Sequence, residues 1–398
     1  MSTMRFGILA IVCPLALACS AGLDESETAA RVETLENGGV HARNPAVGSW
    51  AEGENWRLVE ELRIGSRDGP GPDVFGSIGS LTLAVNPEGR MLVMDGQANR
   101  VQVFDRSGAH VGSFGGGGSG PGEFQSAYIA GWSPENELWI VDPGNARYGV
   151  FSADGEWLGS HAREVGFFMS PWPGLMDSEG RVLDVGIRGR DRVLVRVDAR
   201  AATADTFPLP NYQGGQFQIL NSAGLPMMGA SIPFAGQLVW HLDPRGYVWS
   251  AMTDRYRIVQ QNLAGDTLLI VERASSPVPV TAAERNAALE TLEWFLEAGG
   301  QIDASRIPSV KPLINGLTVD DRGNIWVLPH PSSEAEPIAY DVFDPDGRYL
   351  GAVPTSTPLS FWGARPVFRG NHVYGFTLDD LGIPFLVRLR IDGREPTN

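Results

Sequence analysis

Several residue types are scarce in this sequence, and the shortages of positive charge and of long apolar runs each exclude a class of protein. The 398 residues contain 2 cysteines and a single lysine, Lys311, and 47 acidic residues against 31 basic ones give a net charge of −16. A surface this acidic repels phosphate backbones and anionic lipid headgroups, so we expect no nucleic-acid partner. The apolar run at residues 6–18 is too short to span a bilayer.

The common catalytic and metal-binding motifs are also missing. There is no H-x-H, H-E-x-x-H or G-x-S-x-G, and the 6 histidines are scattered. The stretch GGGGSGPGEF at residues 115–124 contains G-x-G-x-x-G, but Pro121 and Gly122 follow where a helix would have to begin. A phosphate-binding loop of this type needs that helix N-terminus. We therefore interpret the glycines as a tight loop and expect no bound nucleotide.

The N-terminus predicts export. Residues 1–18 combine a basic start with the short apolar run and have the proportions of a signal peptide. ALAC, which ends at Cys19, is similar to the lipobox of bacterial lipoproteins, although residues 16–18 also fit an ordinary cleavage site. Cys13 lies within the signal, so the mature chain would keep one thiol without a disulfide partner, which favours acylation of Cys19.

These features predict a lipid-anchored protein of the bacterial cell envelope, at the outer membrane or facing the periplasm. Its contact with the membrane would be through the lipid alone. Residues 19–55 are small, polar and acidic, and predict a flexible tether. We expect the functional domain to occupy residues 56–398.

A unit of four strands recurs along that domain. LTLAVNPEGRMLVMDGQANRVQVFDRSGAHVGSFG, from Leu81, is followed from Tyr128 by the similar YIAGWSPENELWIVDPGNARYGVFSADGEWLGSH. Each unit reads as strand, tight turn, strand, loop, strand, turn, strand. The first turn of each unit falls at Gly89, Asn136, Gly180, Gly246, Gly323 and Gly370. Six such units predict an all-β fold, a six-bladed β-propeller.

Two irregular segments complete the predicted fold. Residues 394–398, after the last turn, are too few to form the final strand of the sixth unit. Residues 56–64, WRLVEELRI, read as a strand that belongs to no unit, and supplying the missing strand would close the ring without an open edge. Residues 281–300 begin with a capping box, Thr281 and Glu284, and predict one inserted helix.

Two of the units resemble the NHL repeat. Asp142, Asn145 and Arg147 match its D-x-x-N-x-R pattern, and Asp95 and Arg100 match it in the preceding unit. The resemblance implies a six-bladed propeller lipoprotein with NHL-like repeats, a class whose members share a fold and differ in function. Because the residues repeat, we expect the aspartates and arginines to brace loops by turn hydrogen bonds and ion pairing.

The same repeat gives the glycine-rich stretch a structural role. We expect it to lead from the outer strand of one blade to the inner strand of the next, since glycine permits tight, left-handed backbone. Phe75 and Phe124 would then fill the gaps between adjacent blades. The nucleotide interpretation is not needed to explain the glycines.

Without a catalytic motif, the sequence favours a binding module over an enzyme. We expect a monomer with a protein, peptide or carbohydrate partner and without a cofactor. The alternative is a lactonase- or lyase-like enzyme, because INGLTVDDRGNIWV at residues 314–327 resembles a blade of calcium-dependent gluconolactonase-like propellers. That resemblance implies Asn315 as a calcium ligand in the channel, although the family's acidic ligands have no matching motifs here.

Non-repeating segments predict where a partner binds. They fall in the connections between blades and in the loops between second and third strands, which share one face around the channel mouth. Aromatic and arginine side chains dominate binding hot spots. The residues that we expect to line this face are Trp172, Asn315, His330, Trp362 and Arg365. We expect the 281–300 helix to serve as a lid over this face. An alternative that the sequence supports equally well is that Trp172 and Trp362 only fill gaps between blades.

Overall fold

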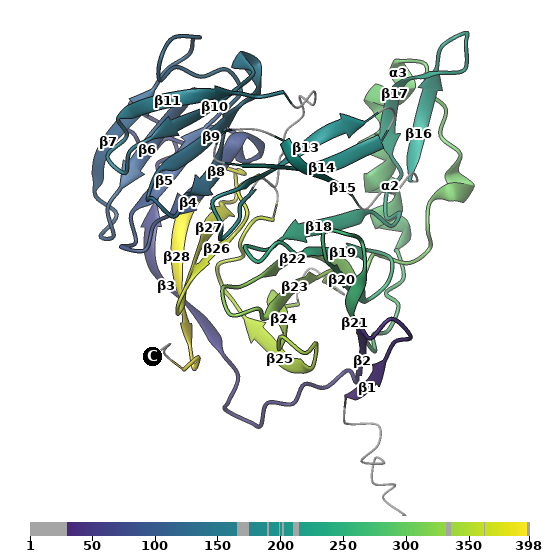
Figure 1. Ribbon diagram of the computed structural model, residues 1–398. Helices are drawn as coiled ribbons and strands as arrows, with labels where there is room; N and C mark the ends of the chain where they lie inside the picture. Colours follow the sequence, from purple (N-terminus) through teal and green to yellow (C-terminus); the bar gives the residue numbers. More distant parts are fainter. Residues whose placement is uncertain are drawn as a thin grey trace, which may run out of the picture.

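Six sheets form a ring in the computed structural model (Figure 1). The structure describes residues 30–164, 175–188, 191–198, 200, 203–209, 215–331, 336–361 and 363–395. Each of these sheets contains four strands that are antiparallel to their neighbours, and one sheet carries two further strands. The predicted six-bladed β-propeller is therefore confirmed. The predicted signal peptide at residues 1–18 lies outside the described residues.

The blades follow one another along the chain, each from an inner strand at the axis to an outer strand at the rim. Blades one and two consist of β4 (Leu81–Val85), β5 (Met91–Asp95), β6 (Arg100–Phe104), β7 (His110–Gly115), β8 (Tyr128–Trp132), β9 (Leu138–Asp142), β10 (Arg147–Phe151) and β11 (Trp157–Ala162). Blades three and four consist of β12 (Leu175–Met176), β13 (Val182–Arg188), β14 (Asp191–Val197), β15 (Thr203–Pro208), β18 (Leu238–Leu242), β19 (Val248–Met252), β20 (Arg257–Gln261) and β21 (Thr267–Arg273). Blades five and six consist of β22 (Ile314–Val319), β23 (Ile325–Pro329), β24 (Ala339–Phe343), β25 (Tyr349–Pro354), β26 (Val367–Arg369), β27 (His372–Leu378), β28 (Pro384–Asp392) and β3 (Arg57–Ile64).

Burial falls from the middle of each blade to its rim, which explains the sequence pattern of the strands. All five residues of β5 and of β9 are buried, because a second strand is covered by neighbouring blades on both faces. The outer strand β7 alternates between exposed and half-buried residues instead. The apolar cores therefore lie between blades.

Phenylalanines fill two of these gaps, as predicted. Phe75 makes edge contacts with Phe104 of blade one and Phe376 of blade six, with ring centroids 6.2 and 5.5 Å apart. Phe124 packs 5.6 Å from Phe151 of blade two and is almost fully buried. Each ring is supplied by the segment that leads into the next inner strand.

The predicted bracing of the glycine-rich loop is confirmed in blade two. Asp142 accepts a hydrogen bond from Asn145 at 2.7 Å and pairs with Arg147 at 3.3 Å. Asn145 and Arg147 donate in turn to the carbonyl oxygens of Gly118 and Gly120, each at 2.9 Å. The loop presents its carbonyl oxygens to a side-chain amide and a guanidinium of the protein itself, which suits bracing and not phosphate binding.

Blade one departs from the predicted ion pair. Asp95 accepts hydrogen bonds from the backbone amides of Gly76, Gln97 and Ala98 at 2.8 to 3.2 Å. Arg100 lies opposite Asp95 in the strand register, but its side chain is exposed and makes no ion pair among the described residues. The carboxylate still braces a loop here, with amide donors in place of the guanidinium.

The N-terminal strand closes the ring as predicted. β3 pairs antiparallel with β28 from Leu386↔Ile64 to Asp392↔Arg57, so blade six is built from both ends of the chain. Arg394, just beyond β28, forms a buried ion pair with Asp320 of blade five at 2.9 Å. Closure covers the outer edge of β28 and gives blade six four strands like the other blades.

The prediction of a flexible tether over residues 19–55 is wrong for its second half. β1 (Arg31–Thr34) and β2 (Val40–Asn44) form a hairpin, and β2 pairs in parallel with β21, which extends blade four to six strands. Ala42 is fully buried, and the Asn44 amide donates to the carbonyl oxygen of Gly347 in blade five. The hairpin therefore contacts two blades.

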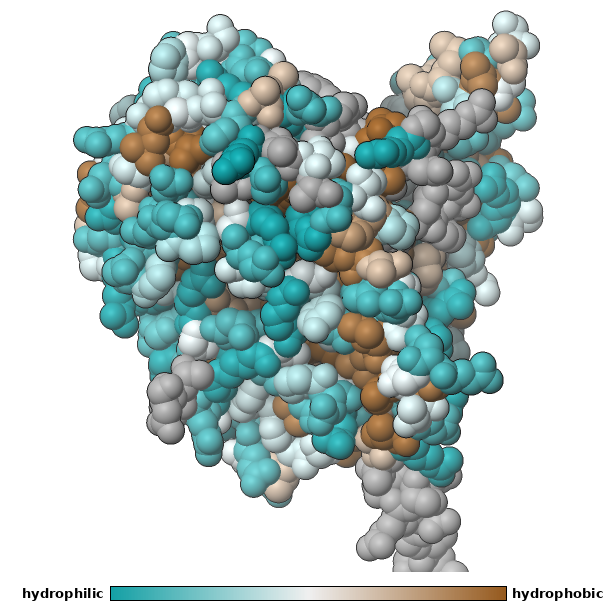
Figure 2. All heavy atoms as spheres, in the orientation of Figure 1, coloured by the Kyte–Doolittle hydropathy of each residue, from teal (hydrophilic) through white to brown (hydrophobic). Residues whose placement is uncertain are grey.

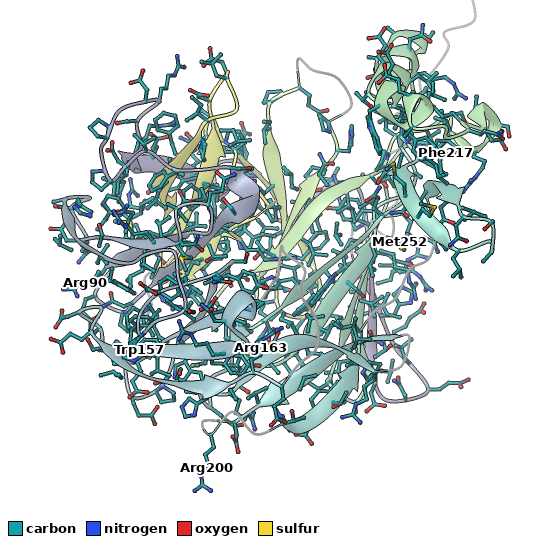
Figure 3. The ribbon with its side chains drawn as sticks, turned by 90° about the horizontal axis from the view of Figure 1, so that it is seen from above. Arg90, Trp157, Arg163, Arg200, Phe217 and Met252 are labelled. Atoms are coloured by element: carbon teal, nitrogen blue, oxygen red, sulfur yellow. The ribbon has the colours of Figure 1, made fainter. Side chains whose placement is uncertain are left out.

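Two insertions combine into a single projection at the rim (Figure 1, upper right). The hairpin of β16 (Gln216–Leu220) and β17 (Pro226–Ser231) precedes blade four, and α2 (Ala282–Glu290) and α3 (Glu293–Glu297) follow it. The predicted inserted helix is thus confirmed but interrupted at Thr291 and Leu292. Phe217, labelled in Figure 3, packs with Phe295 in a small core of its own.

The projection also carries exposed apolar side chains. Leu225 and Met227 at the hairpin and Trp294 of α3 are each about half exposed or more, and residues 216–231 contain no charge. Apolar atoms lie among polar ones on this projection in Figure 2, at upper right. None of the described residues of either insertion lines the channel cavity defined below. The insertions thus pack on each other and not over that cavity, where a lid would have to lie.

Candidate functional site

A cavity of about 310 Å³ lies on the propeller axis, and we call it the channel cavity. Residues of all six inner strands or their ends line it. Its wall consists of residues 82–85, 129–132, 175–178, 241, 242, 244, 319–321 and 363–369. Because inner strands of a propeller run side by side around the axis, no single blade could form this site.

The wall spans the length of the inner strands. Arg365 lies at the beginning of the blade-six strand, on the side where blades are connected. Asp177, Asp321 and Arg369 lie at the opposite ends, next to the turns between first and second strands. The cavity therefore reaches from the predicted ligand face toward the turn face.

The carboxylates of the cavity wall are already engaged with the protein. Asp177 pairs with Arg181 at 2.8 Å, and Asp320 pairs with Arg394 at 2.9 Å. Asp321 accepts a hydrogen bond from the backbone amide of Gly370 at 2.6 Å. The negative charge of the wall is therefore largely neutralised within the fold.

Arg365 differs from these carboxylates. Its side chain is partly exposed to the cavity and makes no hydrogen bond or ion pair among the described residues. Burial lowers the pKa of its guanidinium to about 10, so the group stays protonated at neutral pH. An unpaired cation at a partly desolvated position is costly unless a ligand compensates it.

Two further donors around the cavity lack partners. His241 of β18 is 8% exposed, and neither of its ring nitrogens has a hydrogen-bond partner within the described part of the chain. The indole nitrogen of Trp132 is also buried and also lacks a hydrogen-bond partner among the described residues. Burial, and secondarily the charge of Arg365, hold the pKa of His241 well below its usual value, so the ring is neutral and keeps one N–H.

Arg369 adds a second guanidinium at the turn end. Its Nε donates to the carbonyl oxygen of Val85 at 3.1 Å, and burial lowers its pKa. The rest of the wall is largely apolar, with Leu83, Ile129 and Val319 among its side chains. An apolar chamber with a few convergent donors is the usual form of a small-molecule site.

Asn315 and His330 lie together in a different place. They line a pocket of about 400 Å³ between blades four and five, which we call the inter-blade pocket. Asn315 is the extra residue of a β-bulge between β22 and β23 and is exposed. His330 donates its backbone amide to the carbonyl oxygen of Leu313 at 3.0 Å. Bulges of this kind re-aim a side chain near functional sites.

The predicted site residues are thus divided. Asn315 and His330 share the inter-blade pocket, Arg365 belongs to the channel cavity, and Trp172, Trp362 and Cys19 lie outside the described residues. Sequence reasoning missed His241 and Trp132. One sequence signal could have identified them. Near the ends of their inner strands, His241 and Trp132 stand where blade one has the small apolar residues Ala84 and Val85.

Within the described residues, no group of three or more His, Cys, Asp or Glu side chains is arranged to hold a metal ion. The Asp341 carboxylate, which lines the inter-blade pocket, already accepts hydrogen bonds from Tyr256, Tyr349 and Arg273 at 2.6 to 2.9 Å.

None of the described helices has the length and apolar character of a membrane span.

Comparison with known proteins gives distant structural similarities. No family model and no curated protein matches the chain. A Bacteroides fragilis protein described as exported is 13% identical, with a TM-score of 0.49 over 88% of this chain and 99% of that one. Virginiamycin B lyase from Staphylococcus aureus is 10% identical, with a TM-score of 0.44 over 84% of this chain and 99% of that one. At this level the similarities carry no argument about function, and the fold rests on the sheet order.

Proposed function

We propose that this protein is an exported binding module that takes a small ligand, or the end of a peptide or carbohydrate, into the channel cavity. The observation that carries the proposal is the convergence of all six inner strands on one chamber that holds donors without partners among the described residues. Such donors are what a ligand with acceptor groups would satisfy. The proposed role is recognition on a rigid scaffold.

A cavity-filling variant tests the place of binding. Leu83→Trp adds bulk inside the chamber, and Val111→Trp, on an exposed position of β7, is the matched control. We would screen carboxylates, amides, sugars and short peptides by ligand-detected NMR. At least one class should bind wild type and the control but not Leu83→Trp. If every ligand that binds does so equally well to Leu83→Trp, the channel cavity is not the site.

The proposed location rests on Cys19. Acylation there would hold the propeller at the envelope by a chain of about ten residues before β1, and would leave the channel free for ligand. Cys19→Ser should move the protein from the membrane fraction to the soluble exported fraction. A Cys19→Ser protein that still sediments with membranes would contradict the anchor while leaving the binding proposal intact.

An enzyme of the lactonase or lyase type is the second candidate, and the bulged Asn315 beside His330 favours it. This activity would belong to the inter-blade pocket. Calcium titration followed by thermal melting tests it. A calcium-dependent rise in melting temperature that Asn315→Ala abolishes would support the enzyme over the binding module.

A further inference from the structure

The wall of the channel cavity does not share the strong negative charge of the protein as a whole. The chain carries a net charge of −16, yet the described cavity wall combines paired carboxylates with the unpaired guanidinium of Arg365. His241 adds two buried ring nitrogens and Trp132 adds one, and none of the three has a hydrogen-bond partner among the described residues. Arginine, a neutral histidine in its N–H form and indole are all donors toward an acceptor.

The shape of these donors indicates the kind of acceptor. A guanidinium is planar and offers two parallel N–H groups, which match the two oxygens of a carboxylate. The single charge of the guanidinium matches the single charge of one carboxylate. The apolar side chains of Leu83 and Val319, which line the same cavity, would surround the hydrocarbon part of the ligand. A chamber of about 310 Å³ is at the small end of ligand sites.

We propose that the channel cavity binds a carboxylate, with Arg365 as its bidentate partner and the His241 ring N–H as an additional donor. This inference rests on the proposed function and names the ligand chemistry for the same site. A free organic acid and the C-terminal carboxylate of a short peptide present the same group. The ligand would remove the cost of the unpaired cation, so binding and stability are coupled.

Fluorine NMR tests the proposal with defined probes. The probes are 4-fluorobenzoate and 6-fluorohexanoate, each with its amide, and a fluorophenylalanine tripeptide with a free or an amidated C-terminus. Wild type should bind at least one acid and bind its amide far more weakly. Because a hydrogen bond to a charged group contributes about 1.5–3 kcal/mol, Arg365→Gln should weaken acid binding by about 10- to 100-fold.

Two control variants separate charge from geometry. Arg57→Gln removes an equal charge from an exposed position of β3 and should bind the acid as wild type does. Arg365→Lys keeps the charge but loses the fork, and should retain only part of the affinity. Which probe binds distinguishes the sources: a small acid alone indicates a metabolite, and a tripeptide alone indicates a chain terminus.

A measurement without ligand is independent of the choice of probe. Arg365→Met replaces the unpaired cation by an apolar side chain of similar length, so it should raise the melting temperature of the unliganded protein. A lower melting temperature would mean that Arg365 is already satisfied within the fold, which would overturn the proposal.

The binding outcomes separate this inference from the proposed function. The carboxylate proposal is overturned if no acid binds, if acid and amide bind equally, or if Arg365→Gln binds the acid as wild type does. Neutral probes that Leu83→Trp excludes and Arg365→Gln retains would leave the channel as a binding site for another chemistry. Probes that bind regardless of Leu83→Trp would remove both proposals.

Discussion

Arg163 holds the carboxylate of Asp184 across the boundary between blades two and three, with Nε 2.7 Å from Oδ2 and both side chains buried. The hydroxyl of Tyr148, also in blade two, donates to the same oxygen at 2.7 Å. The boundary between blades four and five repeats the device, since Asp341 binds Arg273 and Tyr256 of blade four. Buried aspartates thus join neighbouring blades by charge as well as by apolar packing.

Removing the cation from this boundary should destabilise the propeller strongly. Arg163→Met leaves the buried Asp184 without its countercharge, and breaking a buried pair in this way costs about 3–5 kcal/mol. The measurement is urea unfolding followed by tryptophan fluorescence. Arg90→Met, which breaks the exposed pair with Asp154, is the control and should cost less than about 1 kcal/mol. Equal costs would show that the boundary does not depend on the ion pair.

Asn44 should be the most sensitive residue of the N-terminal hairpin. Its amide donates to the carbonyl oxygen of Gly347 at 2.8 Å, and its side-chain oxygen accepts from the backbone amide of Tyr349 at 2.8 Å. Asn44→Ala would leave both buried groups of blade five unsatisfied, at a cost of about 1–3 kcal/mol. Asn37→Ala, which removes an exposed bond to Thr267, should cost less. The free energies of unfolding in urea compare the two variants directly.

Truncation should separate the closing strand from the preceding residues. A chain that begins at residue 30 keeps β1, β2 and β3, and should melt as the longer chain does. A chain that begins at residue 65 lacks β3, so β28 becomes an open edge with unpaired backbone groups. We expect it to be less stable and to aggregate, as measured by thermal melting and light scattering. Similar behaviour of the two chains would contradict ring closure by β3.

The inserted helix should be sensitive to acid. The Glu284 carboxylate bonds with Lys311, the largest influence, and with the Thr281 cap, and these contacts lower its pKa from 4.5 to about 2. A depressed pKa stabilises the folded state above the unfolded pKa, and this contribution is lost as the pH falls from about 4.5 through about 2.

Hydrogen exchange of the amides in α2, corrected for intrinsic rates, measures that loss. Wild type should lose protection between pH 4.5 and 2, whereas Glu284→Gln should be less protected at pH 6 and change little over the acid range. Glu290→Gln, on the same helix, is the control and should follow wild type. Parallel pH profiles for wild type and Glu284→Gln would contradict the role of the carboxylate.

The sequence predicts those parts of the fold that repeat or depend on local patterns. Strand units, blade-gap phenylalanines and the capping box at Thr281 all follow from spacing and residue type. The β1–β2 hairpin was missed, because its short polar sequence resembles a tether and its partner β21 lies more than 200 residues away. Asp95 was mistaken for the partner of Arg100 because the repeat does not specify which donors reach the carboxylate.

The channel cavity was predictable only in part. The insertion-rich connection before blade six drew attention to Arg365, but His241 belongs to blade four and Trp132 to blade two. Which residues of six separate strands meet at one axis depends on the rotation between blades and on ring closure. Neither quantity is encoded in a local pattern, so unpartnered donors become visible only in the assembled ring.

Closure by β3 imposes an order on biogenesis. A chain synthesised from its N-terminus delivers this strand before any blade and its partner β28 last, with five blades in between. During that interval β3 is an unpaired strand that could join another molecule. Its sequence RLVEELRI places Arg57, Glu60, Glu61 and Arg63 among the apolar residues, and such charges oppose intermolecular pairing. The charged side chains that lie on the rim of the folded propeller would therefore also protect the nascent protein from aggregation until β28 pairs with β3.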